Sequence, residues 1–397
     1  MTFEIAVVGG AGHVGLPLAI AFASRNKKTL IYDLNTDAIQ TIMSGEMPFI
    51  EPGAREMLQA AIKQNNIDGS SNPQSLKGIK TLIVVIGTPV DEHLNPDPYA
   101  VVNALKKLQP YLSDGQHVVL RSTVFPGVTA LVNGWLLKTG LNIQVSFCPE
   151  RIAEHKAMEE LFSLPQIVSG MSKEAEEKAA ELFRTLTSKI VPLSPEEAEL
   201  AKLITNSWRY IKFAAANEFF MLANDRGLDF ERIREALSYE YPRASDLPRA
   251  GFAAGPCLFK DTMQLSAALD NRFMLGHSAM LVNEGLPLYV ISKMAKKFDL
   301  PNLRVGILGM AFKGESDDIR SSLSYKLKKA LQLRCESVVT SDPFVPLSVD
   351  SSLVTTDELL DLCDVIIIGA PHGVYRDIKF TKPVVDVWNL RGEGVLI

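Results

Sequence analysis

A thiol, an ammonium group and a carboxylate lie within five residues of one another near the middle of the chain. They belong to Cys257, Lys260 and Asp261, and a glycine and a proline precede them. A cation beside a cysteine favours the thiolate over the thiol, whose usual pKa is about 8.5, and the thiolate is the form that attacks a carbonyl carbon. The segment therefore indicates covalent chemistry on an aldehyde. The alternative is an inert cysteine that serves as a small buried apolar side chain.

A glycine-rich turn near the amino terminus indicates a dinucleotide site. It follows a β-branched segment, residues 3–8, and precedes a helix-forming segment. Gly10, Gly12 and Gly15 have the GxGxxG spacing, in which the glycines allow a tight turn, approach of a pyrophosphate and packing of the helix on the strand. A second strand ends in Asp33, where a carboxylate binds a ribose diol and repels a 2′-phosphate. We therefore predict NAD; a doubly wound domain that binds nothing is the alternative.

Three further strands are predicted, and a polar cluster follows each one. The strands cover residues 81–86, 117–120 and 144–147. Ligands of an open parallel sheet lie beyond the carboxyl ends of the strands, so Thr88, Thr123 and Glu150 are candidate site residues. Threonines that cap helices and a surface pair of Glu150 with Arg151 are the alternative interpretation.

A long helix is predicted from Ser194 to about Asp225, because Ser194 is followed by a proline and two acids, as at a helix start. Its apolar residues exceed what one small layer needs, which indicates a dimer interface. They are Leu200, Leu203, Ile204, Ile211, Ala215, Phe219 and Leu222. Lys202, Asn206 and Arg209 share one face and form either a solvated stripe or part of a site.

A second α/β domain is predicted to begin near residue 300, after a helical segment at 275–297. Its strands are expected up to residue 308 and at 338–342, 365–369 and 383–386. Lys313, Asp317, Asp318 and Arg320 cluster after the first of them. Because this domain lacks GxGxxG, we expect it to bind a substrate phosphate rather than a second dinucleotide.

Composition excludes several classes of partner. The 41 basic and 46 acidic residues are mixed along the chain, so no basic tract suggests nucleic acid. The cysteines are far apart and have no neighbouring histidines, which predicts neither a metal site nor disulfides: Cys148, Cys257, Cys335 and Cys363. No signal sequence or membrane span is evident, so we expect a cytoplasmic protein without membrane contacts.

Taken together, the motifs resemble those of the UDP-glucose/GDP-mannose dehydrogenase family, the nucleotide-sugar 6-dehydrogenases. In order they are GGAGHVG at 9–15, GTP at 87–89, STVFPG at 122–127, CPERI at 148–152, ELAKLITN at 199–206, GPCLFKD at 255–261 and GMAFKGESDDIR at 309–320. The resemblance covers nearly the whole chain. It implies an α/β fold with two Rossmann-like doubly wound domains joined by a central helical domain with a long helix.

The domain boundaries follow from the same resemblance. We expect an NAD-binding domain over 1–190, a central dimerisation domain with the nucleophile loop over 191–300, and a UDP-sugar-binding domain over 301–397. The protein is expected to be a homodimer or higher homo-oligomer.

The resemblance implies an NAD-dependent, four-electron oxidation of the C6 alcohol of a UDP-sugar to a UDP-uronic acid, as used in polysaccharide biosynthesis. Cys257 would trap the C6 aldehyde as a thiohemiacetal, which the second hydride transfer turns into a thioester. Lys202 and Asn206 would stabilise the oxyanion. Asp261, Glu150 and Thr123 would orient and activate water, with Glu150 as the base for hydrolysis.

The family's binding residues carry over to matching positions of this chain. Cofactor-binding positions are Gly10, Gly12, His13, Val14, Asp33, Thr88, Thr123, Lys260 and Arg320. Substrate-binding positions are Glu150, Arg151, Ile152, Ala153, Lys202, Asn206, Arg243 and Lys313, with Arg243 reaching the substrate of a partner subunit.

The motifs disagree about the sugar. The sequence from Cys148 to Arg151 resembles the branch that acts on UDP-N-acetylhexosamines such as UDP-N-acetylmannosamine, whereas Lys260 is closer to the UDP-glucose branch. His155 and the residue before it stand where a glycine is common in the family. Residues 253–256 stand where the family commonly has a glycine-rich segment before the nucleophile.

Two other functions remain open at this stage. A two-electron, β-hydroxyacid-type NAD dehydrogenase also pairs a lysine and an asparagine on a central helix. A non-catalytic NAD-binding protein would keep the fold without turnover. Cys257 separates the first from the four-electron reaction, since only the latter needs a thiol nucleophile.

Overall fold

The computed structural model describes residues 3–394 and Ile397 and separates into two compact units. The first unit runs to Thr205 and the second begins at Asn206, so their boundary lies within the long helix α8 (Pro195–Asp225). Each unit is built on a parallel sheet that is covered by helices. The predicted fold class, with two Rossmann-like domains and a long central helix, is confirmed, whereas the predicted division into three domains stays a prediction.

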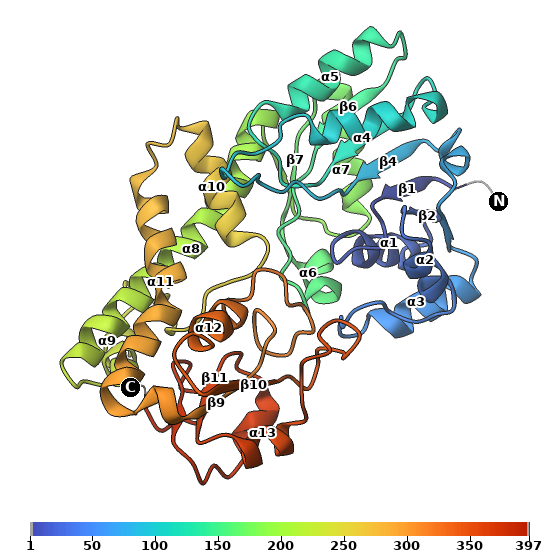
Figure 1. Ribbon diagram of the computed structural model, residues 1–397. Helices are drawn as coiled ribbons and strands as arrows, with labels where there is room; N and C mark the ends of the chain where they lie inside the picture. The colour runs from blue at the N-terminus through green and yellow to red at the C-terminus, as the bar shows by residue number, and fades with distance from the viewer. Residues whose placement is uncertain (1–2, 395–396) are drawn as a thin grey trace. The chain divides into compact units, whose positions relative to one another are not determined.

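The first unit is built on a six-stranded parallel sheet (Figure 1). Its strand order is β3-β2-β1-β4-β5-β6, and Ile5 of β1 lies opposite Thr29 of β2 and Thr81 of β4. The strands are β1 (Ile5–Val8), β2 (Thr29–Tyr32), β3 (Ile67–Ser70), β4 (Thr81–Val84), β5 (His117–Leu120) and β6 (Gln144–Phe147), with a separate parallel pair β7 (Gln166–Val168) and β8 (Ile190–Pro192). This order, which grows outward in both directions from β1, is typical of dinucleotide-binding domains.

Helices cover both faces of this sheet because its strands are apolar on both sides. The face formed by Ile5, Val7 and Ile31 packs against α1 (Gly15–Ser24), α2 (Thr36–Met43), α3 (Ala54–Lys63), α6 (Ala157–Ser163) and α7 (Lys173–Arg184). The opposite face packs against α4 (Ala100–Leu108) and α5 (Val128–Lys138), which lie together on one side of the sheet in Figure 1. The carboxyl ends of the strands stay available for loops.

The second unit contains a four-stranded parallel sheet with the order β10-β9-β11-β12. Its strands are β9 (Arg304–Leu308), β10 (Ser337–Ser341), β11 (Val365–Ile368) and β12 (Val384–Val385). One face packs against α12 (Leu323–Leu331) and α11 (Met274–Lys297), and the other against α13 (Thr356–Leu362). The remaining helices are α9 (Phe230–Ser238) and α10 (Leu258–Ala268).

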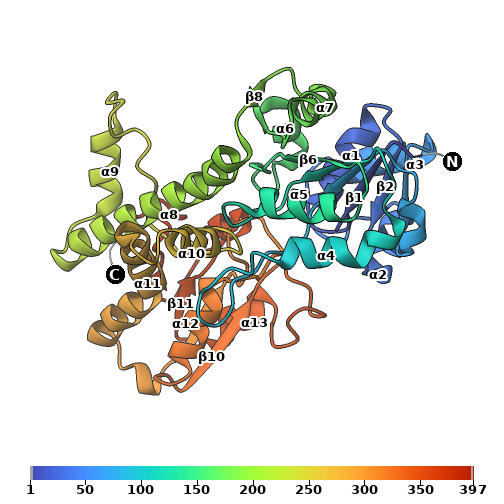
Figure 2. The ribbon, with the colours of Figure 1, turned by 90° about the horizontal axis from the view of Figure 1, so that it is seen from above.

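The two longest helices, α8 and α11, form where the sequence predicts them. Ser194 and Glu197 exchange hydrogen bonds in a capping box that starts α8. Within the second unit, α8 and α11 lie side by side (Figure 2). The buried side-chain amides of Asn217 and Asn283 join them with a hydrogen bond of 2.9 Å. No helix in the described part of the chain is long and apolar enough to cross a membrane.

A histidine lies in the core of the first unit, at the start of β5. His117 is 5% exposed, and its Nε2 lies 2.8 Å from the Ser146 hydroxyl, which in turn donates to the carbonyl of Ala175. Because the hydroxyl proton is used, the imidazole Nε2–H must donate to Ser146. Burial, and then the nearby charge of Lys178, lowers the pKa of His117 from 6.5 to about 4. The core therefore accommodates the neutral ring.

We predict that His117 makes the stability of the first unit depend on pH. The unfolded histidine takes up a proton near pH 6.5 and the folded one does not, so stability is complete above that pH and falls as the pH drops toward 4. The His117 contribution is expected to lower the free energy of unfolding by about 2 kcal/mol when the pH falls from 7 to 5. His117→Gln is expected to remove that part of the dependence in urea denaturation.

Tryptophan fluorescence can follow the unfolding of the first unit in urea. Trp135 lies in that unit, and replacing Trp208 and Trp388 of the second unit by phenylalanine leaves Trp135 as the reporter. His93→Gln, at an exposed turn, is the matched control and is expected to keep the wild-type pH dependence. Equal pH dependence in the wild type and in His117→Gln would contradict the prediction.

Candidate functional site

The turn between β1 and α1 leaves space for a pyrophosphate. A Cβ atom at Gly10 would lie 2.6 Å from the carbonyl oxygen of Val7, and one at Gly15 would lie 2.4 Å from that of Gly9, so the chain itself requires both glycines. A Cβ at Gly12 would meet only one carbonyl oxygen, at 3.9 Å. The protein therefore does not fill the space above Gly12, which fits the close approach of a ligand phosphate.

The start of α1 and the end of β2 complete this half of the predicted cofactor site. Val14 is the N-cap residue of α1 and makes no side-chain cap, so the helix start suits a phosphate. The amide of Ala11, in the glycine turn, donates to Asp33 at 3.0 Å, and the amide of Asn35 donates to its other oxygen. His13 stacks on Phe49 with ring centroids 4.1 Å apart. The residues present fit NAD.

The loops after β4 and β5 are joined to each other. The Thr88 hydroxyl donates to the carbonyl of Thr123 at 2.5 Å, and the amide of Ile86 donates to the hydroxyl of Ser122 at 2.7 Å. The structure thus brings two of the predicted residues, Thr88 and Thr123, together at the carboxyl edge of the sheet. The Thr123 side chain is half-buried.

Glu150 is held at the end of β6 by a buried arginine. Arg121 Nε and Nη2 donate to Glu150 Oε2 at 2.9 and 2.5 Å, while the amides of Arg151 and Ile152 donate to Oε1 at 2.7 and 3.0 Å. Arg121 is 1% exposed and stacks on Phe183. A carboxylate accepts about four hydrogen bonds, so these donors fill its acceptor sites. The arrangement favours an orienting role for Glu150.

Two further carboxylates hold the segment after Glu150. The amide of Ala153 donates to Glu160 at 2.6 Å, and the amides of His155 and Ala157 donate to the two oxygens of Glu51 at 2.9 Å each. His155 has a φ angle of 68°, a left-handed conformation that favours glycine. This explains physically why a glycine suits the position, and why a histidine needs the Glu51 contacts.

The two predicted residues of α8 differ in environment. Lys202 is half-buried in the first unit, and Asn206, the first residue of the second unit, is 3% exposed. Arg209, predicted on the same face, is exposed. The face of α8 that carries these three residues is therefore buried only in part.

A buried carboxylate joins three predicted residues of the second unit. Asp261 accepts from Asn206 Nδ2 on one oxygen and from Lys260 Nζ on the other, both at 2.5 Å, and its own side chain is 0% exposed. Cys257 is exposed and is the N-cap residue of α10, whose fourth residue is Asp261. A negative charge on sulfur at that position interacts favourably with the helix dipole.

The loop before Cys257, residues 251–256, packs on the glycine turn after β9. Gly255 has a φ angle of 105°, and a Cβ atom there would lie 2.7 Å from the ring of Phe312, so only glycine fits. Lys313 Nζ lies 5.4 Å from the centroid of the same ring. The structure therefore brings the segments of Cys257 and Lys313 together within the second unit.

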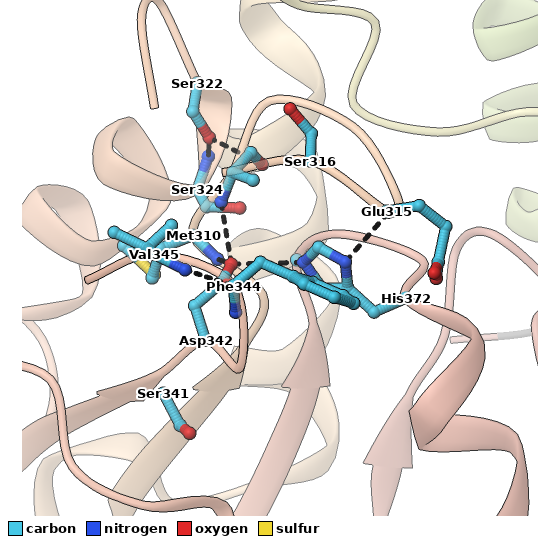
Figure 3. A network of polar contacts seen from close by, with 12 residues as sticks. Met310, Glu315, Ser316, Ser322, Ser324, Ser341, Asp342, Phe344, Val345 and His372 are labelled. Carbon is cyan, nitrogen blue, oxygen red and sulfur yellow. Dashed lines mark hydrogen bonds and ion pairs between the residues drawn. The ribbon is translucent and has the colours of Figure 1, made fainter. Parts of the chain in front are cut away.

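Asp342 holds this glycine turn in place, as Figure 3 shows. Oδ2 accepts from the amides of Met310 and Ala311 at 2.7 and 3.0 Å, and it lies 3.1 Å from His372 Nε2. The amide of Glu315 donates to His372 Nδ1, so the Nε2–H donates to Asp342. Despite burial, the contacts with His372 lower the pKa of Asp342. The turn that carries Lys313 is thereby anchored at several points.

The last two predicted residues are more exposed. Arg320 is held by Asp318, with Nε 2.9 Å from both carboxylate oxygens, and half of its side chain reaches solvent. Arg243 lies in an exposed segment after α9, where Nη1 is 3.4 Å from the Tyr241 hydroxyl.

Sequence reasoning missed the residues that support the site. Arg121 belongs to the polar cluster that follows residues 117–120, and Glu199 begins the motif ELAKLITN, but the sequence alone assigned neither residue a role. Asn217 was not considered, although its Nδ2 donates to the carbonyl of Gly251 and its Oδ1 accepts from the Gly251 amide, at the start of the loop before Cys257. The available signal was a polar residue at an apolar position of a predicted element.

We predict that Arg121→Met destabilises the first unit by about 3–5 kcal/mol, because it leaves the Glu150 carboxylate buried without its counter-ion. Arg121→Met combined with Glu150→Gln is expected to be more stable than the single variant, since no unpaired charge remains. Urea denaturation of the variants measures both effects. A double variant that is no more stable than Arg121→Met would contradict this assignment.

Comparison with known proteins places the chain in one family along nearly its whole length. Residues 3–187 match the NAD binding domain of the UDP-glucose/GDP-mannose dehydrogenase family, residues 196–284 its central domain, and residues 306–392 its UDP binding domain.

Individual relatives agree with this match. A UDP-N-acetyl-D-mannosamine dehydrogenase of Yersinia pestis is 28% identical, with both chains covered completely. The structure of a UDP-D-ManNAc dehydrogenase from Pyrococcus horikoshii is 27% identical with a TM-score of 0.90, covering 97% of this chain and 95% of the other. A UDP-glucose dehydrogenase structure from Pyrobaculum islandicum is 25% identical, also with a TM-score of 0.90, covering 98% and 95%. The chain belongs to the UDP-glucose/GDP-mannose dehydrogenase family and is an NAD-dependent UDP-sugar dehydrogenase.

Proposed function

We propose that this protein oxidises the C6 alcohol of a UDP-sugar to a carboxylate in two steps that pass through a covalent adduct on Cys257. The observation that carries the proposal is the position of this exposed cysteine, at the N-cap of α10 and one turn before the ion pair of half-buried Lys260 with buried Asp261. A thiol placed in this way is suited to attack an aldehyde. An enzyme that only interconverts an alcohol and an aldehyde needs no nucleophile there.

NAD supplies the hydride acceptor at both oxidation steps. Gly10, Gly12, His13 and Val14 would hold its pyrophosphate, and Asp33 would bind its ribose. The remaining cofactor positions are Thr88, Thr123, Lys260 and Arg320.

In the first oxidation, carbon C6 would lose a hydride to the bound NAD, and the C6 hydroxyl would lose its proton to solvent. The Cys257 thiolate then forms a bond to the aldehyde carbon, and the oxyanion that results takes up a proton to give a thiohemiacetal. Lys202 and Asn206 would stabilise the oxyanion with a positive charge and a fixed N–H donor. Asn206 donates one amide proton to Asp261 and keeps a second for the substrate.

In the second oxidation, the thiohemiacetal loses a hydride and a proton and becomes a thioester. Water adds to the carbonyl carbon, the carbon–sulfur bond breaks, and the products are a carboxylate and the Cys257 thiolate. Thr123, Glu150 and Asp261 would orient and activate this water. The remaining substrate positions, Arg151, Ile152, Ala153 and Lys313, would bind the nucleotide sugar.

A UDP-N-acetylhexosamine is the substrate that we favour, with UDP-glucose as the second candidate. The run from Cys148 to Arg151 and the relative from Yersinia pestis support the first. Lys260 and the structural likeness to the UDP-glucose dehydrogenase of Pyrobaculum islandicum support the second.

We predict that the purified protein forms two NADH for each molecule of one UDP-sugar consumed. The measurement is absorbance at 340 nm with NAD and a panel of UDP-glucose, UDP-galactose, UDP-N-acetylglucosamine, UDP-N-acetylmannosamine and GDP-mannose. Cys257→Ala is expected to abolish acid formation, because no thiohemiacetal can form.

Cys335→Ala, at a half-buried cysteine of the second unit, is the matched control and is expected to keep full activity. One NADH for each sugar, no turnover with any member of the panel, or acid formation by Cys257→Ala would each overturn the proposed reaction.

We also propose that α8 joins two copies of the chain. Trp208, Ile211, Ala215, Phe219 and Leu222 recur every three or four residues and form one apolar stripe. Three of them are more than half exposed: Trp208 at 55%, Phe219 at 51% and Leu222 at 56%. Such a stripe on a helix is typical of a surface that a second helix covers. The exposed Arg243 would then be available to the partner's substrate.

We predict that Phe219→Glu combined with Leu222→Glu converts the oligomer to a monomer, because two buried carboxylates in each stripe oppose association. Sedimentation velocity measures the change in mass. Leu333→Glu, at a residue that is 84% exposed outside the stripe, is the control and is expected to leave the mass unchanged. A wild-type protein that is already monomeric would contradict the proposal.

A further inference from the structure

A buried carboxylate in the second turn of α8 has no role in the chemistry proposed above. Glu199 is 1% exposed and lies one turn before Lys202. Burial raises the pKa of its carboxyl group, in opposition to its hydrogen bonds. A carboxylate is retained in such a position only where donors compensate for lost water.

The donors come from a segment about seventy positions earlier in the chain. The amide of Gly127 donates to Glu199 Oε2 at 2.6 Å, and the amide and hydroxyl of Thr129 donate to Oε1 at 2.8 and 2.5 Å. These groups stand at the start of α5, whose N-cap residue is Gly127 and therefore offers no capping side chain. Glu199 supplies the cap from another helix.

The same loop carries Thr123, and its other end is also tied. Thr88 and Ser122 join it to the end of β4 through the bonds described above. The loop from Ser122 to Gly127 therefore lies between one anchor at the sheet edge and another on α8. All of these residues belong to the first unit.

We propose that Glu199 is a positioning residue that clamps the Thr123 loop to α8 and so sets the position of Thr123 relative to Lys202. The inference rests on the proposed function for the roles of Thr123 and Lys202. The clamp itself rests on the three hydrogen bonds. A helix moved by a fraction of an ångström would misplace the reacting groups, and misplacement by 1 Å lowers rates by about a hundredfold.

Glu199→Gln tests the clamp with little change of shape. The amide keeps one acceptor oxygen and turns an NH₂ group toward a donor of the loop, so at least one bond is lost. We expect kcat to fall by about tenfold or more with NAD affinity within about twofold of wild type, since the change acts on alignment. Hydrogen–deuterium exchange of residues 124–132 is expected to rise.

Glu197→Gln is the matched control, because Glu197 also accepts a backbone amide at the start of α8 but caps only its own helix at an exposed position. It is expected to leave kcat and exchange of residues 124–132 unchanged. Glu199→Gln combined with Thr123→Ala is expected to be little worse than Thr123→Ala alone, because Glu199 acts through that residue.

Unchanged kcat in Glu199→Gln, or effects on kcat that add to those of Thr123→Ala, would overturn the positioning role. If Glu199→Gln does not fold, Thr129→Val can replace it, because it removes only the hydroxyl donor. Thr129→Val is expected to lower kcat and to raise hydrogen–deuterium exchange of residues 124–132, each by a smaller amount. A wild-type enzyme without turnover of any UDP-sugar would sink the proposed function, whereas the exchange measurement would still decide whether the clamp exists.

Discussion

Buried carboxylates that accept backbone amides hold the loops of both units. Glu199 and Glu150 do so at the edge of the first sheet, and Asp342 does so at the edge of the second. A turn beyond a strand leaves amides without partners in the ladder, and an unpaired buried amide is costly. Each carboxylate satisfies two or more of them at once. The same contacts make the loops rigid, which positioned chemistry requires.

The two sheets repeat one architecture but use it differently. Asp33 and Asp342 each follow the second strand of their sheet and accept from the glycine turn. Asp33 is half-buried, whereas Asp342 is enclosed by backbone amides and His372 and has no oxygen to offer a ribose. Counted from the end of the strand, the position of Gly12 is occupied in the second turn by Phe312, whose ring packs against Gly255. The second turn is thus packed by its own chain, and the expectation that it binds no dinucleotide stays a prediction.

Local patterns in the sequence predicted most of the strands and the limits of α8, because periodicity and capping act over a few residues. Strand β3 (Ile67–Ser70) was missed, since its aspartate and glycine disfavour a strand and distant contacts, such as its pairing with β2, stabilise it. Of the site, the sequence indicated the groups that we propose to face ligands. The groups behind them, Arg121 and Glu199, depend on partners that are 29 and about 70 residues away, and no local pattern records such a pair.

The proposed thioester hydrolysis would impose a further condition on Glu150. A general base must accept a proton from water, and a carboxylate whose four acceptor sites are filled can do so only when one donor withdraws. Arg121 is enclosed and also donates to the carbonyl of Cys148 and to the side chain of Gln166, so its withdrawal would be costly. The amides of Arg151 and Ile152 belong to the predicted substrate segment and are the donors that a bound substrate can draw away. A role for Glu150 as base therefore depends on substrate binding to the segment of Arg151 and Ile152, whose amides donate to Glu150.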